Sequence, residues 1–146
     1  AFTKLYGMAG VRLGYCLCSD TELLARMRAA GQPWAVSSLA QAAGIAALDE
    51  TEYVAKVRAL IEAQRPVLAD GLRALGLRVI EGRANYLLFR APEALSEALR
   101  RKGAVLRSCG NYPGLDASWY RTAVRTENEN RQLLALLAET LPEVAQ

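Results

Sequence analysis

Histidine is absent from this sequence of 146 residues. Its absence excludes acid–base catalysis by histidine, hydrolase triads that need an imidazole, and zinc sites with histidine ligands within this chain. Only three cysteines occur, Cys16, Cys18 and Cys109, and their spacing is not typical of a metal site. We therefore expect no metal site, and we expect reduced thiols in a cytoplasmic setting.

Long apolar runs and blocks of like charge are also missing. Arginine or glycine interrupts every apolar stretch well before it reaches the length of a membrane-spanning helix. The net charge of +3 is small and spread along the chain, so it gives no indication of a nucleic-acid partner. We expect neither a membrane nor a nucleic acid as a partner. The 52% of hydrophobic residues are enough for a globular core.

The first half of the chain is mainly helical in its pattern. Residues 11–18 are the exception, because they predict a short buried strand in which Cys16 and Cys18 pack as small hydrophobic side chains. Two capping boxes, Ser19 with Glu22 and Ser38 with Gln41, predict helices over 20–30 and 39–48. The second helix is rich in alanine, and its apolar surface favours self-association of this chain.

A long helix is predicted to begin at Thr51. Proline at position 66 should kink it, because proline lacks the backbone donor and clashes with the preceding turn. Gly76 is suited to end it, since glycine readily adopts the left-handed conformation of a helix C-terminus. We expect the boundary between two substructures in this helix.

Strands and short helices alternate after Gly76. We expect strands over 77–80, 86–90, 104–107 and 119–125, with a helix over 92–102 closed by Gly103. Thr126 and Glu129 form a further capping box, which begins a closing helix that runs to 141. This order behind a long helix predicts an α+β layer with a small, mostly antiparallel sheet. Alternation in the last strand places Arg121 and Arg125 on the face opposite Tyr120, Thr122 and Val124.

Near its start the chain has a lysine, a loop with two glycines, and an arginine eight residues after the lysine. The amine of Lys4 can attack an aldehyde when it is unprotonated, which partial burial favours. The guanidinium of Arg12 is a fixed fork for a phosphate dianion, and the hydroxyl of Thr3 can add a hydrogen bond. A lysine and an arginine at this spacing are, without further context, usually two surface charges.

The whole string changes that interpretation. Thr3-Lys4 followed by Gly10-Val-Arg-Leu-Gly-Tyr15 resembles the Schiff-base lysine signature of class I and II aminotransferases, Ser-x-Thr-Lys and then Gly-x-Arg-x-Gly-Tyr. Ala1 stands where that family usually has serine, which would remove one phosphate contact if alanine is native. The resemblance implies pyridoxal 5'-phosphate as the cofactor. It further implies Lys4 as the catalytic lysine that holds the cofactor, with Thr3 and Arg12 as ligands of its phosphate.

A second set of residues resembles the same family. It consists of Arg107-Ser-Cys-Gly-Asn-Tyr-Pro-Gly-Leu and the strand Tyr120-Arg-Thr-Ala-Val-Arg, with Glu129-Asn130 after it. The first segment is similar to the threonine-phosphate decarboxylases of cobalamin biosynthesis and, less closely, to histidinol-phosphate aminotransferases. The resemblance implies that Arg121 binds the substrate carboxylate and that Arg107 binds a carboxylate or a phosphate. Cys109 is expected to pack in the core.

The resemblance covers essentially the whole chain and implies an α/β enzyme of fold type I. Residues 1–50 would be a remnant of the large cofactor-binding domain, and residues 51–146 would be the connecting helix and the α+β C-terminal small domain. Since the chain begins without an initiator methionine, we expect it to be part of a longer protein. That protein is expected to be a homodimer acting on a small amino-acid or amino-phosphate substrate, whereas this part alone is expected to be inactive.

Three interpretations of function stay open at this point. The resemblance favours a pyridoxal-phosphate decarboxylase acting on a phosphorylated amino acid, with transamination, as in histidinol-phosphate aminotransferase, as the runner-up. A second interpretation is a non-catalytic binding or interaction module of the same fold. The third, an unrelated small α/β protein, is remote, because two separate motifs occur in the family's order.

Overall fold

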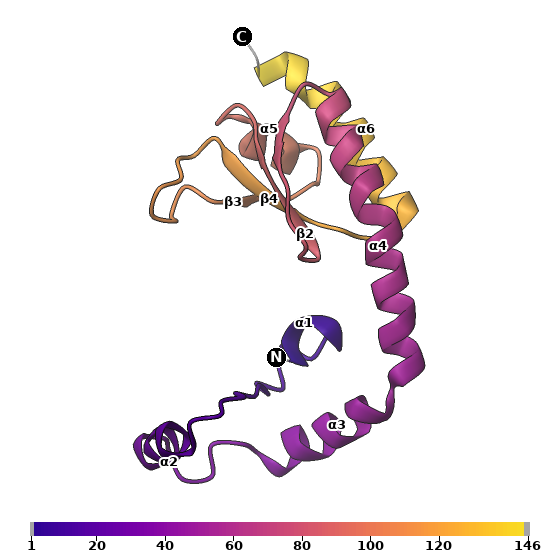
Figure 1. The fold of residues 1–146 in the computed structure, drawn as a ribbon. Helices are drawn as coiled ribbons and strands as arrows, with labels where there is room; N and C mark the ends of the chain where they lie inside the picture. The colour runs from indigo at the N-terminus through magenta and orange to yellow at the C-terminus, as the bar shows by residue number, and fades with distance from the viewer. Residues whose placement is uncertain (1, 145–146) are drawn as a thin grey trace. The chain divides into compact units, whose positions relative to one another are not determined.

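The structure is a computed structural model that describes residues 2–144. These residues form two compact units, the first ending at Val57 and the second beginning at Arg58. The division falls inside α4 (Thr51–Ala74), the long helix labelled in Figure 1. The domain boundary at residues 50 and 51 stays a prediction. No helix in the described part combines the length and the apolar composition needed to cross a lipid bilayer.

The first unit contains three helices before α4, namely α1 (Phe2–Leu5), α2 (Thr21–Ala30) and α3 (Ser38–Asp49). Both predicted capping boxes were wrong by one residue. The side chain of Asp20 accepts from Leu23 N at 2.9 Å and caps α2. The side chain of Ser37 caps α3 in the same way, through Ala40 N at 3.2 Å. Each cap is a neighbouring residue with its own acceptor, so the motif alone did not fix which of the two begins the helix.

Residues 11–18 are not a strand, contrary to the prediction from their apolar alternation. They are irregular and almost entirely exposed, and Cys16 and Cys18 are exposed with them. A strand needs a neighbouring strand to pair with its backbone groups. The one sheet of the described chain is made of other segments, so this segment has no ladder partner there.

Helix α3 buries its small side chains and exposes its large ones. Its buried residues are Ala40, Gly44 and Ala47, and a Cβ atom added at Gly44 would overlap the side chain of Leu13. By contrast, Leu39 is 81% exposed, and Ile45 and Leu48 are also exposed. Small residues therefore make the packed face of this helix, while its bulky apolar residues form an open surface.

The second unit has a four-stranded antiparallel sheet in the order β1-β2-β4-β3. Its strands are β1 (Arg78–Ile80), β2 (Tyr86–Arg90), β3 (Arg107–Ser108) and β4 (Trp119–Ala123). Helix α5 (Leu95–Arg101) follows β2, and α6 (Glu127–Val144) ends the described chain. The predicted α+β layer with an antiparallel sheet is confirmed, and so are the bounds of β2.

The predicted strand 104–107 was placed too early. Gly103 has a φ of 82°, and the backbone N–H of Ala104 donates to Leu99 O at 2.9 Å. This bond turns the chain back onto the end of α5, so the backbone of Ala104 is not free for a ladder. The strand begins only at Arg107, where pairing with β4 starts.

One face of the sheet packs on the helices. Phe89 and Tyr120 stack with ring centroids 5.9 Å apart, and both are buried. They share a core with residues of all three helices, namely Leu68, Leu72, Leu95, Leu99 and Leu137. Gly71 permits the contact between α4 and α6, because a Cβ atom there would overlap Leu134; the two helices run side by side in Figure 1. Tyr120, Thr122 and Val124 are all buried, so the face that these residues were predicted to share is the one turned toward the core.

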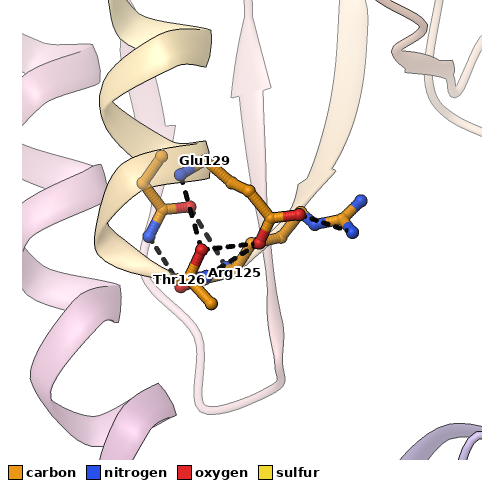
Figure 2. A network of polar contacts seen from close by, with 4 residues as sticks. Arg125, Thr126 and Glu129 are labelled. Carbon is orange, nitrogen blue, oxygen red and sulfur yellow. Dashed lines mark hydrogen bonds and ion pairs between the residues drawn. The ribbon is translucent and has the colours of Figure 1, made fainter.

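The beginning of α6 is the predicted capping box, drawn in Figure 2. Thr126 N donates to Glu129 Oε2 at 3.2 Å, and Glu129 N donates to Thr126 Oγ1 at 3.5 Å. Arg125 Nη2 forms an ion pair with Glu129 Oε1 at 2.7 Å, and the side chain of Arg125 is exposed. Asn130 is buried beside them. Its Oδ1 accepts a hydrogen bond from Arg125 N, and its Nδ2 donates to Arg125 O and to Gln64 Oε1. This amide joins the end of β4, the first turn of α6 and helix α4.

Candidate functional site

Lys4 and Thr3 lie in α1, a single helical turn of the first unit. Thr3 is half-buried, and Lys4 is exposed. Among the described residues, no carboxylate lies within ion-pair distance of the Lys4 amine. The amine is therefore accessible, and the described residues do not provide the burial that we expected around a nucleophilic lysine.

Arg12 occupies an unusual backbone conformation in the same unit. Its φ is 58°, in the left-handed region that non-glycine residues rarely adopt, and its Nη1 donates to Ala9 O at 2.8 Å. Phe2 N donates to Leu13 O at 3.3 Å, so Thr3 and Arg12 each lie one residue from the same backbone bond. Strained backbone of this kind is concentrated at functional sites. The structure thus brings the segments of Thr3, Lys4 and Arg12 together.

Arg107 and Arg121 are direct cross-strand partners in the second unit. They pair in the antiparallel ladder between β3 and β4, so their side chains leave the same face of the sheet. That face is opposite the buried face of β4. Like charges in directly opposed positions repel each other. Within the described chain neither guanidinium is paired with a carboxylate. The pair is therefore a basic site that an anion would stabilise.

The guanidinium groups of Arg107 and Arg121 contact uncharged side chains. The guanidinium of Arg121 lies 4.7 Å from the ring centroid of Tyr86, and that of Arg107 lies 5.6 Å from the ring centroid of Tyr112. Arg107 Nη2 also donates to Asn111 Oδ1 at 2.9 Å. These contacts fix the arginines without neutralising them, which keeps their charge available for a ligand.

A second polar cluster lies on the same face, around the end of β2. Arg90 Nε donates to Ser118 Oγ at 2.9 Å, and its Nη2 lies 3.8 Å from Asp116 Oδ2. Hydrogen bonds from the hydroxyl and the backbone N–H of Ser118 lower the pKa of Asp116, and the charge of Arg90 adds to the effect. Arg90 therefore forms an ion pair with a carboxylate of the chain, whereas Arg107 and Arg121 do not.

Sequence reasoning missed the residues that surround the arginine pair. Tyr86 could have been found, because alternation along the predicted strand 86–90 places it on one face with Arg90. Asn111 and Tyr112 could not have been found from the sequence, because their contact with Arg107 depends on the path of the ten-residue loop between β3 and β4. The predicted site residues are divided between the two units. Thr3, Lys4 and Arg12 lie in the first unit, and Arg107 and Arg121 lie in the second.

Comparison with known proteins identifies the family. The model of the aminotransferase class I and II family matches residues 1–137, so the chain belongs to this family. The chain is 38% identical to threonine-phosphate decarboxylase of Salmonella typhimurium, a match that covers 99% of this chain and 41% of that protein. This chain therefore spans about two-fifths of the length of that relative.

Solved structures agree with this assignment. Histidinol-phosphate aminotransferase from Clostridium acetobutylicum has a TM-score of 0.91 and 31% identity, over 98% of this chain and 45% of that one. Histidinol-phosphate aminotransferase from Sinorhizobium meliloti, solved in complex with pyridoxal-5'-phosphate, has a TM-score of 0.73 and 26% identity, over 98% of this chain and 39% of that one. The predicted fold type is confirmed, and the family is one of enzymes that depend on pyridoxal phosphate.

The donor groups of the first unit fit this cofactor. To bind an aldehyde that carries a phosphate, a protein needs a primary amine for the aldehyde and several hydrogen-bond donors for the phosphate. Lys4 can supply the amine, and Arg12 and Thr3 can supply the donors. Lys4 is exposed, and the left-handed backbone at Arg12 belongs to a loop tied back to α1 by the bond between Phe2 and Leu13. The donor groups of Lys4, Arg12 and Thr3 are therefore chemically compatible with the family's cofactor.

Proposed function

We propose that this chain is part of a pyridoxal-phosphate enzyme that acts on a phosphorylated amino acid, with decarboxylation of threonine phosphate as the first candidate reaction. The observation that carries the proposal is the unneutralised pair of Arg107 and Arg121 on one face of the sheet. A phosphorylated amino acid has a carboxylate and a phosphate, so it offers anions for both guanidinium groups. Similarity to threonine-phosphate decarboxylase over 99% of the chain supports this choice of substrate.

We assign each of the candidate residues a separate role in this enzyme. Lys4 would hold the cofactor through Nζ and afterwards carry a proton on the same atom, while Thr3 and Arg12 would bind the cofactor phosphate. Arg121 would bind the substrate carboxylate, and Arg107 a carboxylate or the substrate phosphate. The bound cofactor supplies the electron sink for the bond that breaks. A homodimeric, cytoplasmic enzyme is part of the same proposal, and the three free cysteines support a reducing compartment.

Histidinol-phosphate aminotransferase is the second candidate. A TM-score of 0.91 with the enzyme from Clostridium acetobutylicum favours it. Its name denotes a phosphorylated amino alcohol, which lacks a carboxylate. In that case both arginines would be available to the phosphate.

The test is to offer threonine phosphate and histidinol phosphate in parallel to the enzyme that contains this chain. We expect release of carbon dioxide from threonine phosphate without a keto acid. Turnover of histidinol phosphate alone, and only with a keto acid, would establish the second candidate instead. Lys4→Ala should abolish both turnover and the visible absorbance of the bound cofactor, whereas Lys56→Ala, at an exposed lysine of α4, should change neither.

A further inference from the structure

The loop between β3 and β4 is closed at its base. Cys109 is buried, and its backbone N–H donates to Trp119 O at 2.8 Å. Gly110 approaches the opposite side of the loop so closely that an added Cβ atom would lie 3.1 Å from Ala117 Cα. Backbone yields less readily than a flexible side chain does, so this close approach favours glycine at position 110. The loop over 109–118 is therefore narrow and defined at the point where it leaves the sheet.

The returning arm of the loop is fastened to the neighbouring strand β2. Asp116 accepts hydrogen bonds from both the backbone N–H and the hydroxyl of Ser118. Ser118 in turn accepts from Arg90 Nε at 2.9 Å. Two further backbone bonds, from Tyr112 N to Cys109 O at 3.0 Å and from Leu115 N to Tyr112 O at 3.1 Å, shape the outgoing arm. The loop is thus restrained on both arms.

The restrained loop presents Asn111 and Tyr112 to Arg107. A guanidinium only donates hydrogen bonds, so the atom of Asn111 that faces it must be the amide oxygen. This bond occupies Nη2, and the ring of Tyr112 lies over the guanidinium. In the described chain Nε and Nη1 of Arg107 have no protein acceptor, and they remain for a ligand. The strand partner Arg121 lies on the same face.

We propose that Asn111 and Tyr112 are positioning residues, which set the guanidinium of Arg107 for a phosphate group bound together with Arg121. The proposal rests on the proposed function in so far as it takes the arginine pair as the anion site. An unrestrained arginine would lose rotamer freedom when it bound an anion, whereas this one is already ordered. Asparagine suits this role better than aspartate, because its oxygen orients the guanidinium without cancelling its charge.

Substitution of Asn111 separates positioning from a merely structural role. Asn111→Ala removes the orienting bond and should weaken phosphate binding about 3- to 10-fold. Asn111→Asp keeps the shape and the acceptor but adds a charge that pairs with Arg107. It should therefore order the guanidinium and still weaken phosphate binding by about 10-fold or more. Tyr112→Leu, which removes the ring, should have an effect similar to that of Asn111→Ala.

The measurement is a titration of the labelled chain with inorganic phosphate at low salt, followed by the NMR signals of the arginine Nε–Hε groups. Arg107→Lys and Arg121→Lys assign the two signals. Asn128→Asp is the matched control, because it adds the same charge at an exposed position of α6 and should leave the affinity within about twofold. Thermal unfolding of each variant shows that the fold is kept.

The outcomes distinguish the two proposals. If phosphate shifts neither arginine signal in the wild-type chain, the arginine pair is not the anion site, and the role of Asn111 falls with the proposed function. If phosphate shifts both signals and the Asn111 variants bind it as the wild type does, only the positioning role is overturned. Weaker binding by Asn111→Ala than by the wild type, and still weaker binding by Asn111→Asp, with Asn128→Asp unchanged, supports the positioning role.

Discussion

Arg121 is the residue whose loss should affect the proposed substrate most. Its guanidinium lies over the ring of Tyr86 and opposite Arg107, with no acid of the described chain to neutralise it. Loss of a charged contact with substrate costs about 2–4 kcal/mol, so Arg121→Ala in the intact enzyme should lower kcat/KM by about 30- to 1000-fold. Arg125→Ala, four residues further along the chain at an arginine paired with Glu129, is the control and should have little effect. Equal losses in both variants would contradict the assignment.

Glu129 should make the stability of the chain depend on pH. Hydrogen bonds from the hydroxyl and backbone N–H of Thr126, and then the charge of Arg125, hold the pKa of Glu129 below its ordinary value of 4.5. A lowered folded-state pKa means that the unfolded chain binds the proton first as the pH falls. The stabilisation is therefore complete above about pH 4.5 and is lost as the pH falls through the folded-state pKa.

Urea unfolding between pH 7 and pH 3 measures this dependence. Glu129→Gln keeps an oxygen acceptor for Thr126 but cannot titrate, so its loss of stability at acid pH should be smaller than that of the wild type. Glu127→Gln, in the same helical turn, removes an acid whose pair with Arg131 is longer, at 3.8 Å, and should retain the wild-type dependence. Identical acid profiles for Glu129→Gln and the wild type would show that the capping box is not responsible.

At the scale of the elements, two glycines end the helices α4 and α5 in the same way. Gly76 has a φ of 77°, its N–H donates to Arg73 O at 2.9 Å, and Leu77 N donates to Leu72 O at 3.2 Å. This is the Schellman arrangement, which returns the chain toward the core. Gly76→Ala should destabilise the chain by about 1 kcal/mol in urea unfolding, because alanine is strained in the left-handed region.

The control for this prediction is another glycine of the second unit. Gly82 has no positive φ, and an added Cβ atom would meet nothing within 4 Å. Gly82→Ala should therefore change the free energy of unfolding by less than about 0.5 kcal/mol. A similar loss in both variants would mean that the left-handed backbone at Gly76 is not the cause.

Which elements could be predicted depended on where their partners lie. The strands of the second unit are paired with each other, so alternation and turns within the sequence were enough to place β2 and β4. Residues 11–18 have a similar apolar pattern but no paired strand in the described chain, and pattern alone could not show this. The face of Arg121 followed from alternation. Its opposition to Arg107 depends on the register that the 109–118 loop imposes, which no local pattern encodes.

At the scale of the whole molecule, most of the exposed large apolar side chains belong to the first unit. Trp34 is 97% exposed, and Leu39, Ile45 and Leu48 are exposed on α3. Apolar surface of this kind favours association between copies. Light scattering of the chain should therefore show a mean mass that rises with concentration.

Charged substitutions test the origin of this association. Ile45→Glu places a charge on the open face of α3 and should reduce the mean mass toward that of a monomer. Val105→Glu makes the same change at an apolar residue of the second unit that is 79% exposed, and it should leave the association unchanged. A wild-type chain that stays monomeric at all concentrations would contradict the prediction.

The opposition of Arg107 and Arg121 should make the sheet sensitive to ionic strength. Like charges directly opposite each other cost about 0.2–1 kcal/mol. The Debye length shortens from about 30 Å at 10 mM salt to about 8 Å at 150 mM, which weakens that repulsion. Added sodium chloride should therefore raise the free energy of unfolding of the wild type relative to Arg107→Gln, where the repulsion is already gone. Sodium sulfate should widen this difference further, because a divalent oxyanion is the kind of ligand expected at the proposed anion site, whereas chloride only screens the two charges.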